Sequence, residues 1–476
     1  MSPTPSQPSV AIAGGGLAGL AAACALSNVG FRVTLFEKRP FLGGRASSWE
    51  HPGTGEVVDN CQHVLFRVCT NLVEFYERIG VAHQIRWFDQ MNFIEPGGRV
   101  SVMKSSSLPA PLHTAPSFLH FPFLNAADKL SITRALGPIL LTEQRDNGQS
   151  FLQWLEGHGQ TPNAIARFWH PILVSALSEE LNRISVSAAA QVVRESMKTP
   201  DARHMGVPTL PLTDLYNAAG DYVLAHGGQL HFRCPVEGFT VDGDQIRMRL
   251  RGKEEIANAE QTVDFLILAL PFDALDSVLP EGPESTPIRE KLAHFENSPI
   301  TGIHLWFDRQ ISDLDHAVLL DRTIQWMFHK SRLQPIRTQN QNGGGRGSYV
   351  ELVVSSSKTL IDKSRSEIVD LALSEVREFF PAAREANLVK STVIKEVNAT
   401  YSPRPGIDAI RPSPITNWLR VFLAGDWTAT GWPATMEGAV RSGYLAAEAL
   451  TRAAGLKEQH FVSSDLAATG FMRLFA

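Results

Sequence analysis

The chain has 476 residues, enough for more than one domain of ~100–200 residues, and 43% hydrophobic content is typical of a globular protein with a sizeable core. Its formal net charge of −5 argues against general affinity for nucleic acid. The four cysteines show neither a CxxC pair nor zinc-ligand spacing, so we predict a reduced intracellular compartment and no metal site. Residues 1–8 are polar and proline-rich and are expected to form a disordered tail.

The first motif, residues 10–37, predicts a strand, a glycine turn, a helix and a second strand that ends on Glu37. Gly14, Gly16 and Gly19 have the G-x-G-x-x-G spacing, which allows a tight turn, close approach of a pyrophosphate and close helix packing. The acid at the end of the second strand is placed to accept hydrogen bonds from ribose hydroxyls. The predicted dinucleotide-binding residues are Gly14, Gly16, Leu17, Ala18, Gly19, Glu37 and Lys38.

Two short polar segments follow. Gly43-Gly44-Arg45 is predicted to form a second contact with a pyrophosphate, and the alternative is an ordinary turn with a solvated arginine. Residues 57–65 are predicted to form an apolar strand interrupted by Asp59, Asn60, Gln62 and His63. Buried polar groups need partners, so this strand is interpreted as a ligand face, with structural side chains as the alternative.

The next part of the chain is apolar and largely helical. Periodicity predicts a helix over 70–80. Residues 105–127 contain no Asp, Glu, Lys or Arg, and four prolines in their core exclude a continuous helix. They predict either a loop packed on the core or an apolar lip that meets a lipid or a membrane surface. Residues 126–191 predict helices, either a substrate-binding insertion or simply packed helices.

The second half returns to the first sheet. A helix over 212–226 precedes strands over 229–250, and the apolar strand 265–270 is predicted to rejoin the first sheet. Strands over 300–307, 317–328 and 348–354 predict a second sheet, with a flexible glycine loop at 342–347 and an amphipathic helix over 365–380. The last ordered part, 421–454, predicts a strand, Gly425-Asp426, and a helix from about Met436. Asp426 either binds sugar or ribityl hydroxyls or belongs to a plain turn. The final residues, FMRLFA, are expected either to be disordered or to pack against a partner.

Three blocks together resemble the FAD-dependent amine oxidase and carotenoid desaturase superfamily: GGGLAGL with Glu37, GGR at 43–45, and GDWTATGWPATMEGAVRSG at 425–443. The resemblance implies FAD as cofactor, with Glu37 at the adenosine ribose and Arg45 near the pyrophosphate. It places the Val236 backbone at the adenine, Gly425 and Asp426 at the ribityl–pyrophosphate region, and the Met436-Glu437 backbone at the flavin pyrimidine edge. It places the strand from Asn60 to Val64 alongside the flavin ring.

The implied fold is α/β, a Rossmann-type FAD-binding domain interleaved with a mixed α+β substrate domain. The expected division gives residues 9–100, 212–290 and 401–454 to the FAD-binding domain. It gives 101–211, mostly helical, and 291–400, a sheet and helix, to the substrate domain, with 455–476 as a tail.

The runs DNCQHVL, TNLVEFYERIG and FLAGDWTATGWPATMEGAVRSG are more specifically similar to the squalene-associated branch, the hydroxysqualene dehydroxylases of the hopanoid pathway. That branch usually has glycine where this chain has Cys61. The resemblance implies reduction of hydroxysqualene to squalene with loss of water, using reduced FAD. Under this hypothesis an acid protonates the leaving hydroxyl and an apolar tunnel excludes water from the allylic cation. His63 is the first candidate acid because histidine titrates near neutrality, Asp59 is the second, and Gln62 orients the hydroxyl.

The sequence also fits two alternative functions. One is a carotenoid- or phytoene-type desaturase, which runs hydride transfer towards the flavin. The other is a non-catalytic flavoprotein that works with squalene synthase-like partners. The expected partners are a long apolar isoprenoid, a synthase and an electron donor. The expected location is the cytoplasm, with peripheral contact with the inner face of a membrane as an open alternative; no apolar run approaches the ~18 residues that would span a bilayer.

Overall fold

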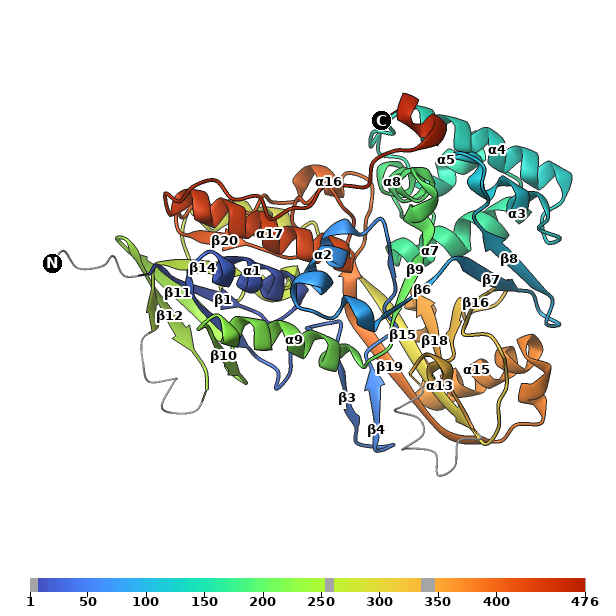
Figure 1. The fold of residues 1–476 in the computed structure, drawn as a ribbon, viewed down its shortest axis with the longest axis horizontal. Coiled ribbons are helices and arrows are strands. Elements are labelled where there is room, and N and C mark those ends of the chain that lie inside the picture. Colours follow the sequence, from blue (N-terminus) through green and yellow to red (C-terminus); the bar gives the residue numbers. More distant parts are fainter. Residues whose placement is uncertain (1–6, 253–260, 335–346, 476) are drawn as a thin grey trace.

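A five-stranded parallel sheet, in the order β10-β2-β1-β14-β20, forms the left side of the molecule in Figure 1. The structure is a computed structural model and describes residues 7–252, 261–334 and 347–475. The strands are β1 (Ser9–Ala13), β2 (Arg32–Glu37), β10 (Gln229–Phe232), β14 (Phe265–Leu268) and β20 (Val421–Leu423). All four pairings are parallel, in the 3-2-1-4-5 order of a doubly wound nucleotide-binding fold. The predicted return of the apolar strand to the first sheet is therefore confirmed.

Alternating side chains of β1 explain why this sheet is covered on both faces. Val10 and Ile12 pack into one core cluster with α2 (Thr70–Arg78) and three longer helices, and Ala11 and Ala13 pack into another with the small antiparallel sheet. The longer helices are α1 (Leu17–Asn28), α9 (Leu212–Ala225) and α17 (Met436–Ala453). The antiparallel sheet consists of β11 (Val236–Asp242), β12 (Gln245–Leu250) and β13 (Gln261–Val263).

A seven-stranded mixed sheet lies at the lower right of Figure 1, in the order β19-β15-β18-β17-β16-β7-β8. Its strands are β7 (Gln90–Ile94), β8 (Val100–Lys104), β15 (Asn297–Phe307), β16 (His316–Leu319), β17 (Trp326–Phe328), β18 (Ser348–Ser355) and β19 (Leu388–Tyr401). Helix α15 (Arg365–Phe379) buries Ile368, Ala372 and Val376 in the core that it shares with this sheet.

The second sheet differs from the sequence prediction in two places. The predicted single strand 317–328 is an antiparallel pair, β16 and β17, with a turn between them. The expected boundary at residue 100 falls inside the β7–β8 hairpin, so part of the predicted FAD-binding segment belongs to this sheet. The glycine loop predicted at 342–347 lies, except for its last residue, outside the described residues.

Helices fill the upper right of Figure 1 and confirm the helical prediction for residues 126–191. They share a core cluster that includes Phe151, Trp169 and Leu173. The helices are α3 (Ala115–Leu119), α4 (Ala126–Leu141), α5 (Phe151–Gly157), α6 (Pro162–Ala164), the π-helix η3 (Ile165–Trp169), α7 (His170–Leu177) and α8 (Val186–Met197). Within the ranges that the structure describes, no helix is long and apolar enough to cross a membrane.

The predicted strand 57–65 is interrupted. Strand β4 (Glu56–Asp59) pairs with β3 (Ser48–His51), and β5 (Leu65–Phe66) pairs with β9 (Met205–Pro208), which also pairs with β6 (Ile85–Phe88). Between β4 and β5 the side chains of Asn60, Gln62 and His63 bond to the carbonyls of Arg45, His63 and Cys61, respectively. These local bonds replace a strand ladder. The segment 60–64 is therefore an irregular stretch rather than a strand.

The remaining elements are short, apart from α2 (Thr70–Arg78), which confirms the helix predicted over 70–80. They are η1 (Ala82–Gln84), η2 (Leu112–Thr114), η4 (Pro200–Arg203), α11 (Phe272–Leu275), α12 (Thr286–Leu292), α13 (Lys330–Leu333), η5 (Lys358–Leu360), η6 (Pro381–Arg384), α16 (Ile407–Ile410) and η7 (Gly470–Leu474).

Candidate FAD and substrate site

One cavity of about 1240 Å³ extends from the first glycine turn to the helical part of the molecule. It brings together segments that are hundreds of residues apart in the sequence. The predicted site residues that line it are Gly14, Gly16, Leu17, Ala18, Glu37, Lys38, Gly44, Arg45, Gln62, His63, Val64, Val236, Gly425, Asp426, Met436 and Glu437. Gly19 and Asp59 do not line it.

The first glycine turn has the shape that a pyrophosphate site requires. Gly14 has φ +109, and a Cβ at Gly19 would lie 2.0 Å from the Gly14 carbonyl oxygen, so both positions are closed to larger residues. Gly16 differs, because a Cβ there would meet only the Gly44 Cα, at 3.8 Å. The open space therefore lies beside Gly16. This residue is also the N-cap of α1 and offers no side chain to the first N–H groups of the helix, which are left for an anion.

The carboxylate of Glu37 is held in place by the glycine turn. Its Oε2 accepts a hydrogen bond from the Gly15 N–H at 2.6 Å, and its Oε1 accepts one from the Arg39 N–H at 2.7 Å. Each carboxylate oxygen has capacity for a further donor, so ribose hydroxyls can still bind. The Glu37 side chain is 5% exposed and lines the cavity beside Lys38.

Arg45 and Asp426 join the two ends of the chain. Arg45 Nη2 donates to Asp426 Oδ1 at 2.6 Å across 381 residues of sequence, and its Nη1 donates to the Ala399 carbonyl at 2.8 Å. The Gly425 N–H donates to Ser442 Oγ on α17 at 2.8 Å, which fixes the turn that carries the acid. Both charged side chains line the cavity, although each already has a protein partner there.

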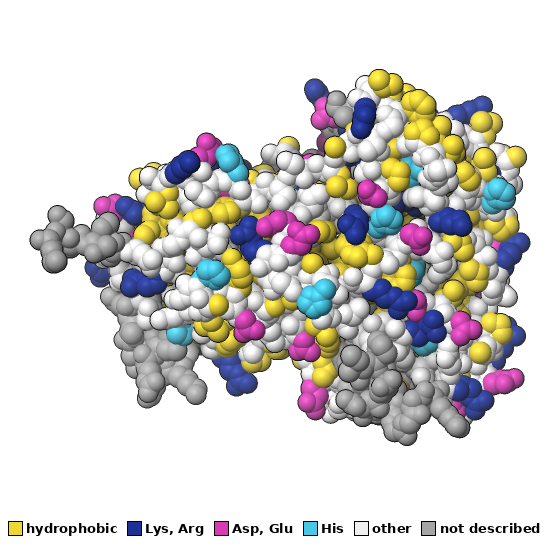
Figure 2. Space-filling view, viewed as in Figure 1, with side chains coloured by type: hydrophobic (Ala, Val, Ile, Leu, Met, Phe, Trp, Pro, Cys, Tyr) yellow, Lys and Arg dark blue, Asp and Glu magenta, His cyan; other side chains and the backbone are white. Residues whose placement is uncertain are grey.

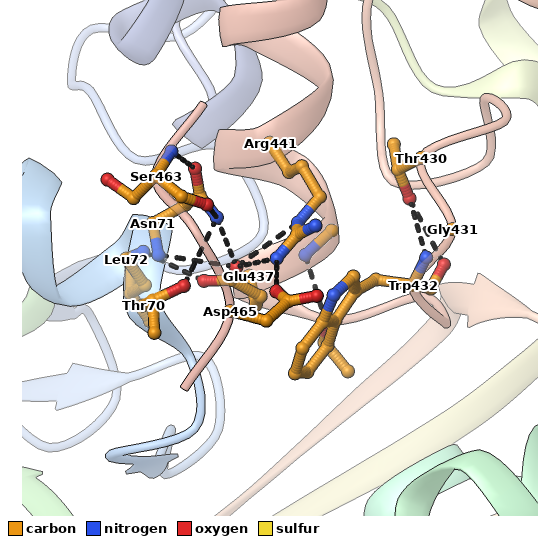
Figure 3. Close-up of polar contacts among 12 residues, drawn as sticks. Thr70, Asn71, Leu72, Thr430, Gly431, Trp432, Glu437, Arg441, Ser463 and Asp465 are labelled. Atoms are coloured by element: carbon orange, nitrogen blue, oxygen red, sulfur yellow. Dashed lines mark hydrogen bonds and ion pairs between the residues drawn. The ribbon is translucent and has the colours of Figure 1, made fainter. Parts of the chain in front are cut away.

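The start of α17 is anchored through the side chain of Glu437 (Figure 3). This carboxylate is 0% exposed and accepts hydrogen bonds from the Leu72 N–H and from Asn71 Nδ2, both at 2.8 Å. Arg441, one turn further along α17, lies 3.2 Å from it and also pairs with Asp465. Glu437 thus joins α17 to α2. Because its side chain is bonded to α2, the place of Glu437 in the cavity wall fits the role predicted for its backbone at the flavin, and not a role for its side chain.

The segment 60–64 carries polar groups into the cavity wall. His63 Nδ1 lies 2.7 Å from the Cys61 carbonyl oxygen, which can only accept, so Nδ1 carries the proton. Burial lowers the pKa of His63 below its usual range, which favours the neutral ring. In that tautomer Nε2 has a free lone pair, and it has no hydrogen-bond partner among the described residues. The ring is therefore arranged to accept a proton.

Asp59 is placed differently from the prediction. It is 1% exposed, lies behind the cavity wall, and its Oδ2 accepts a hydrogen bond from Lys330 Nζ at 2.6 Å. Lys330 Nζ also donates to Gln62 Oε1 at 2.8 Å and lies 3.4 Å from Glu351 Oε2. The paired carboxylate cannot reach a ligand in the cavity, so the structure corrects the interpretation of Asp59 as a candidate acid. Its contacts make it a support for Gln62.

Lys330 and Glu351 were missed by the sequence analysis. They are 1% and 0% exposed, and burial raises the pKa of Glu351 to about 7. A lysine that follows the apolar run 326–328 is the only local sign of such a site. Nothing in the sequence pairs it with an aspartate 271 residues earlier.

The other end of the cavity is apolar. Its wall includes Phe93, Phe118, Leu136, Phe168, Ile172 and Trp326 from β7, α3, α4, η3, α7 and β17. Arg203 also lines this part, where its Nη2 contacts Met103 Sδ, and burial lowers the pKa of Arg203 to about 10. The cavity therefore combines a phosphate-binding end with a long apolar end.

Comparison with protein families identifies the group. Residues 17–451 match the family described as flavin containing amine oxidoreductase. The chain belongs to this family. The family contains flavin, and the protein is an FAD-dependent oxidoreductase with the α/β fold predicted from the sequence. The open space beside Gly16 and the placement of Glu37 and Asp426 around one cavity fit this cofactor.

Several family relatives match over nearly the whole chain. The chain is 27% identical to 15-cis-phytoene desaturase of Synechococcus elongatus, over 93% of this chain and 95% of the relative. It is 27% identical to a probable zeta-carotene desaturase of the same organism, over 93% and 98%. Among solved structures, putrescine oxidase with bound putrescine has a TM-score of 0.69 at 17% identity, over 94% of this chain and 98% of that chain. An oxidoreductase of Methanosarcina mazei has the same TM-score at 14% identity, over 91% and 98%.

Proposed function

We propose that this FAD-dependent oxidoreductase acts on a long apolar isoprenoid and removes hydrogen from it, as the carotenoid desaturases do. The observation that carries the proposal is the apolar end of the cavity, which belongs to the same cavity as the FAD-binding end and His63. The desaturases of Synechococcus elongatus, similar over almost their whole length, support the same substrate class.

The tautomer of His63 supports the direction of the reaction. When bound, FAD supplies a hydride acceptor in its oxidised form and a hydride donor in its reduced form. Desaturation also requires a base, since a proton leaves the substrate together with the hydride. His63 Nε2 holds a free lone pair in the wall of the cavity and takes that proton, while Nδ1 stays bonded to the Cys61 carbonyl.

The surrounding residues hold this base in place and keep water away. Gln62 Nε2 donates to the His63 carbonyl at 2.9 Å, and Lys330 fixes the other end of the Gln62 amide. The apolar wall excludes water from a carbocation on the substrate, which water would otherwise capture.

Reduction of hydroxysqualene to squalene is the second candidate. The segment DNCQHVL and the block at 425–443, which resemble the squalene-associated branch, favour it. This reaction needs an acid at the hydroxyl. His63 would have to enter the reaction as the imidazolium, which burial disfavours. For this reason we place it second.

An anaerobic comparison separates the candidates. We expect the oxidised holoenzyme to lose its flavin absorbance on addition of phytoene or zeta-carotene in detergent, with a desaturated product. Reoxidation of the dithionite-reduced holoenzyme by hydroxysqualene, with squalene formed, would instead establish the second candidate. Bleaching by putrescine but by no isoprenoid would overturn the proposed substrate class. Binding of isoprenoids without any change in the flavin spectrum would indicate a non-catalytic flavoprotein.

A further inference from the structure

The apolar end of the cavity opens at an exposed apolar surface. Leu112, Leu141 and Phe475 line the cavity and are also 47%, 52% and 48% exposed, so the cavity reaches the outside where these side chains lie. Leu119, Phe471 and Leu474 are more than half exposed and belong to the same elements or the segments next to them. We refer to these six residues as the mouth surface.

The C-terminal segment forms part of this surface and is held by hydrogen bonds. The Phe471 N–H donates to the Ala110 carbonyl at 2.8 Å, and the Thr469 N–H donates to the Lys198 carbonyl at 3.1 Å. Met472, between the exposed Phe471 and Leu474, is 3% exposed and lines the cavity. The end of the chain therefore packs beside η2 and contributes to the mouth. For residues 471–475 this corrects the disordered alternative, and Ala476 lies outside the described residues.

Apolar exposure is concentrated here. More than half of the large hydrophobic side chains exposed in the described residues lie within 100–141 and 471–475. Figure 2 shows hydrophobic side chains gathered at the upper right, over the C-terminal segment and the neighbouring helices. Soluble monomers rarely expose large contiguous apolar areas unless something binds there.

Exposed cations outnumber exposed acids beside the mouth surface. Within 100–142 and 466–475 the basic residues are Lys104, Lys129, Arg134 and Arg473, and three of them are exposed. Asp128 is the one acidic residue of these segments, and it is 1% exposed and bonded to Thr161 and Asn163; the exposed Glu143 follows the first segment directly. An excess of exposed cations beside an apolar surface matches the interface of a bilayer that contains anionic lipids.

We propose that the mouth surface docks into an anionic lipid bilayer and that the isoprenoid enters the cavity directly from the hydrocarbon. The proposal rests on the proposed substrate class, since a water-insoluble substrate has to pass from membrane to cavity. The docked side chains enter the headgroup region while Lys104 and Arg473 contact lipid phosphates. A second copy of the chain is a competing occupant, but it would bring the same cations face to face.

Vesicle flotation of the full-length holoenzyme tests the docking. The parent should float with phosphatidylcholine–phosphatidylglycerol vesicles and much less with phosphatidylcholine alone. Leu119→Ser with Leu474→Ser should lower the partition coefficient at least ~tenfold, because two exposed leucines no longer enter the bilayer. Lys104→Gln with Arg473→Gln should remove the preference for phosphatidylglycerol. The matched control is Ile415→Ser with Leu419→Ser, which changes two exposed side chains outside the mouth surface and should float like the parent.

Several outcomes would overturn the docking proposal. The first is failure of the parent to float, and the second is equal flotation of the parent and of the mouth variant, Leu119→Ser with Leu474→Ser. The third is a parent dimer that becomes monomeric in the mouth variant while flotation is unchanged. Turnover separates this proposal from the proposed function. The mouth variant should match the parent with detergent-dispersed substrate and lose activity with vesicle-embedded substrate. If neither protein turns over dispersed isoprenoid, the function proposal fails while flotation still decides the docking.

Discussion

One hydrogen bond of His63, from Nδ1 to the Cys61 carbonyl, determines which ring nitrogen can exchange a proton with a ligand. Because its Nδ1–H is committed to the Cys61 carbonyl, only Nε2 is left to act on a ligand. A change of protonation therefore converts the same atom from base to acid. The environment sets this choice, since burial lowers the pKa of His63 and keeps Nε2 unprotonated at neutral pH.

Replacement of His63 tests this role. We expect His63→Ala to lower turnover of the isoprenoid by ~10²-fold or more with the FAD content unchanged. For the parent, kcat/KM should fall as the pH drops through the lowered pKa of His63, because protonation removes the base, and it should stay level above neutrality. A rate that instead falls as the pH rises would assign His63 as an acid and favour hydroxysqualene reduction. Unchanged turnover in His63→Ala would remove His63 from both mechanisms.

At the scale of elements, the cofactor site depends on how closely α1 and α17 pack. A Cβ at Gly443 would lie 2.2 Å from the Ala18 carbonyl oxygen and 3.0 Å from the Ala22 nitrogen, both on the backbone of α1. The N-termini of these two helices line the same cavity, at Gly16 and at Met436. Their close contact therefore sets the distance between the two ends of the FAD site.

Gly443→Ala is expected to separate the two helices. A backbone neighbour cannot move aside as a side chain can, so we expect a loss of ~1–3 kcal/mol in the free energy of unfolding and at least a tenfold weaker affinity for FAD. Urea unfolding and FAD titration of the deflavinated protein measure the two effects. Gly137→Ala on α4 is the control, because its Cβ meets nothing within 4 Å and should be neutral or slightly stabilising. Equal FAD affinity in both variants would contradict the argument.

The elements that the sequence predicts correctly are those determined by local contacts. The spacing of Gly14, Gly16 and Gly19 and the apolar strand before them specify a strand–turn–helix over a few residues, and the structure has it. The irregular segment 60–64 was missed because side-chain bonds to backbone carbonyls compete with strand pairing without changing the apolar pattern. The hairpin of β16 and β17 was predicted as one strand, because both halves are apolar.

At the scale of the whole molecule, the parts that escaped prediction are contacts between distant segments. The Lys330–Asp59 pair joins residues 271 apart, and the C-terminal segment reaches back to Ala110. Neither contact has a periodic or spaced signature, since each depends on how distant segments of the chain fold around one cavity. The FAD site was accessible to sequence analysis because its segments carry recognisable motifs even though they are equally far apart.

The buried titratable groups predict how the stability of the whole protein depends on pH. Burial lowers the pKa values of His113, His316 and His329 to about 4, so the unfolded chain binds more protons below pH 6.5 and stability falls as the pH drops from there towards 4. Burial raises the pKa of Glu351 to about 7, so between pH 4.5 and 7 the folded state binds more protons than the unfolded chain. The contribution of the protonated Glu351 to stability is therefore lost as the pH rises from 4.5 through 7. Stability should therefore decline through the histidines as the pH drops from 6.5 towards 4, and the Glu351 contribution should be lost as the pH rises towards 7.

Two variants separate these contributions in urea unfolding between pH 5 and 8. Both ring nitrogens of His113 lack hydrogen-bond partners in the described residues, so His113→Leu should raise stability at pH 5 more than at pH 7, by a few kcal/mol at most. Glu351→Gln keeps the shape of the side chain but cannot ionise, so the decline in stability as the pH rises towards 7 should flatten. An unchanged acid slope in His113→Leu would mean that its ring is protonated in the folded protein. An unchanged decline in Glu351→Gln would place the excess proton of the Lys330 cluster on another group, because Asp59 and Glu351 share the single buried ammonium of Lys330.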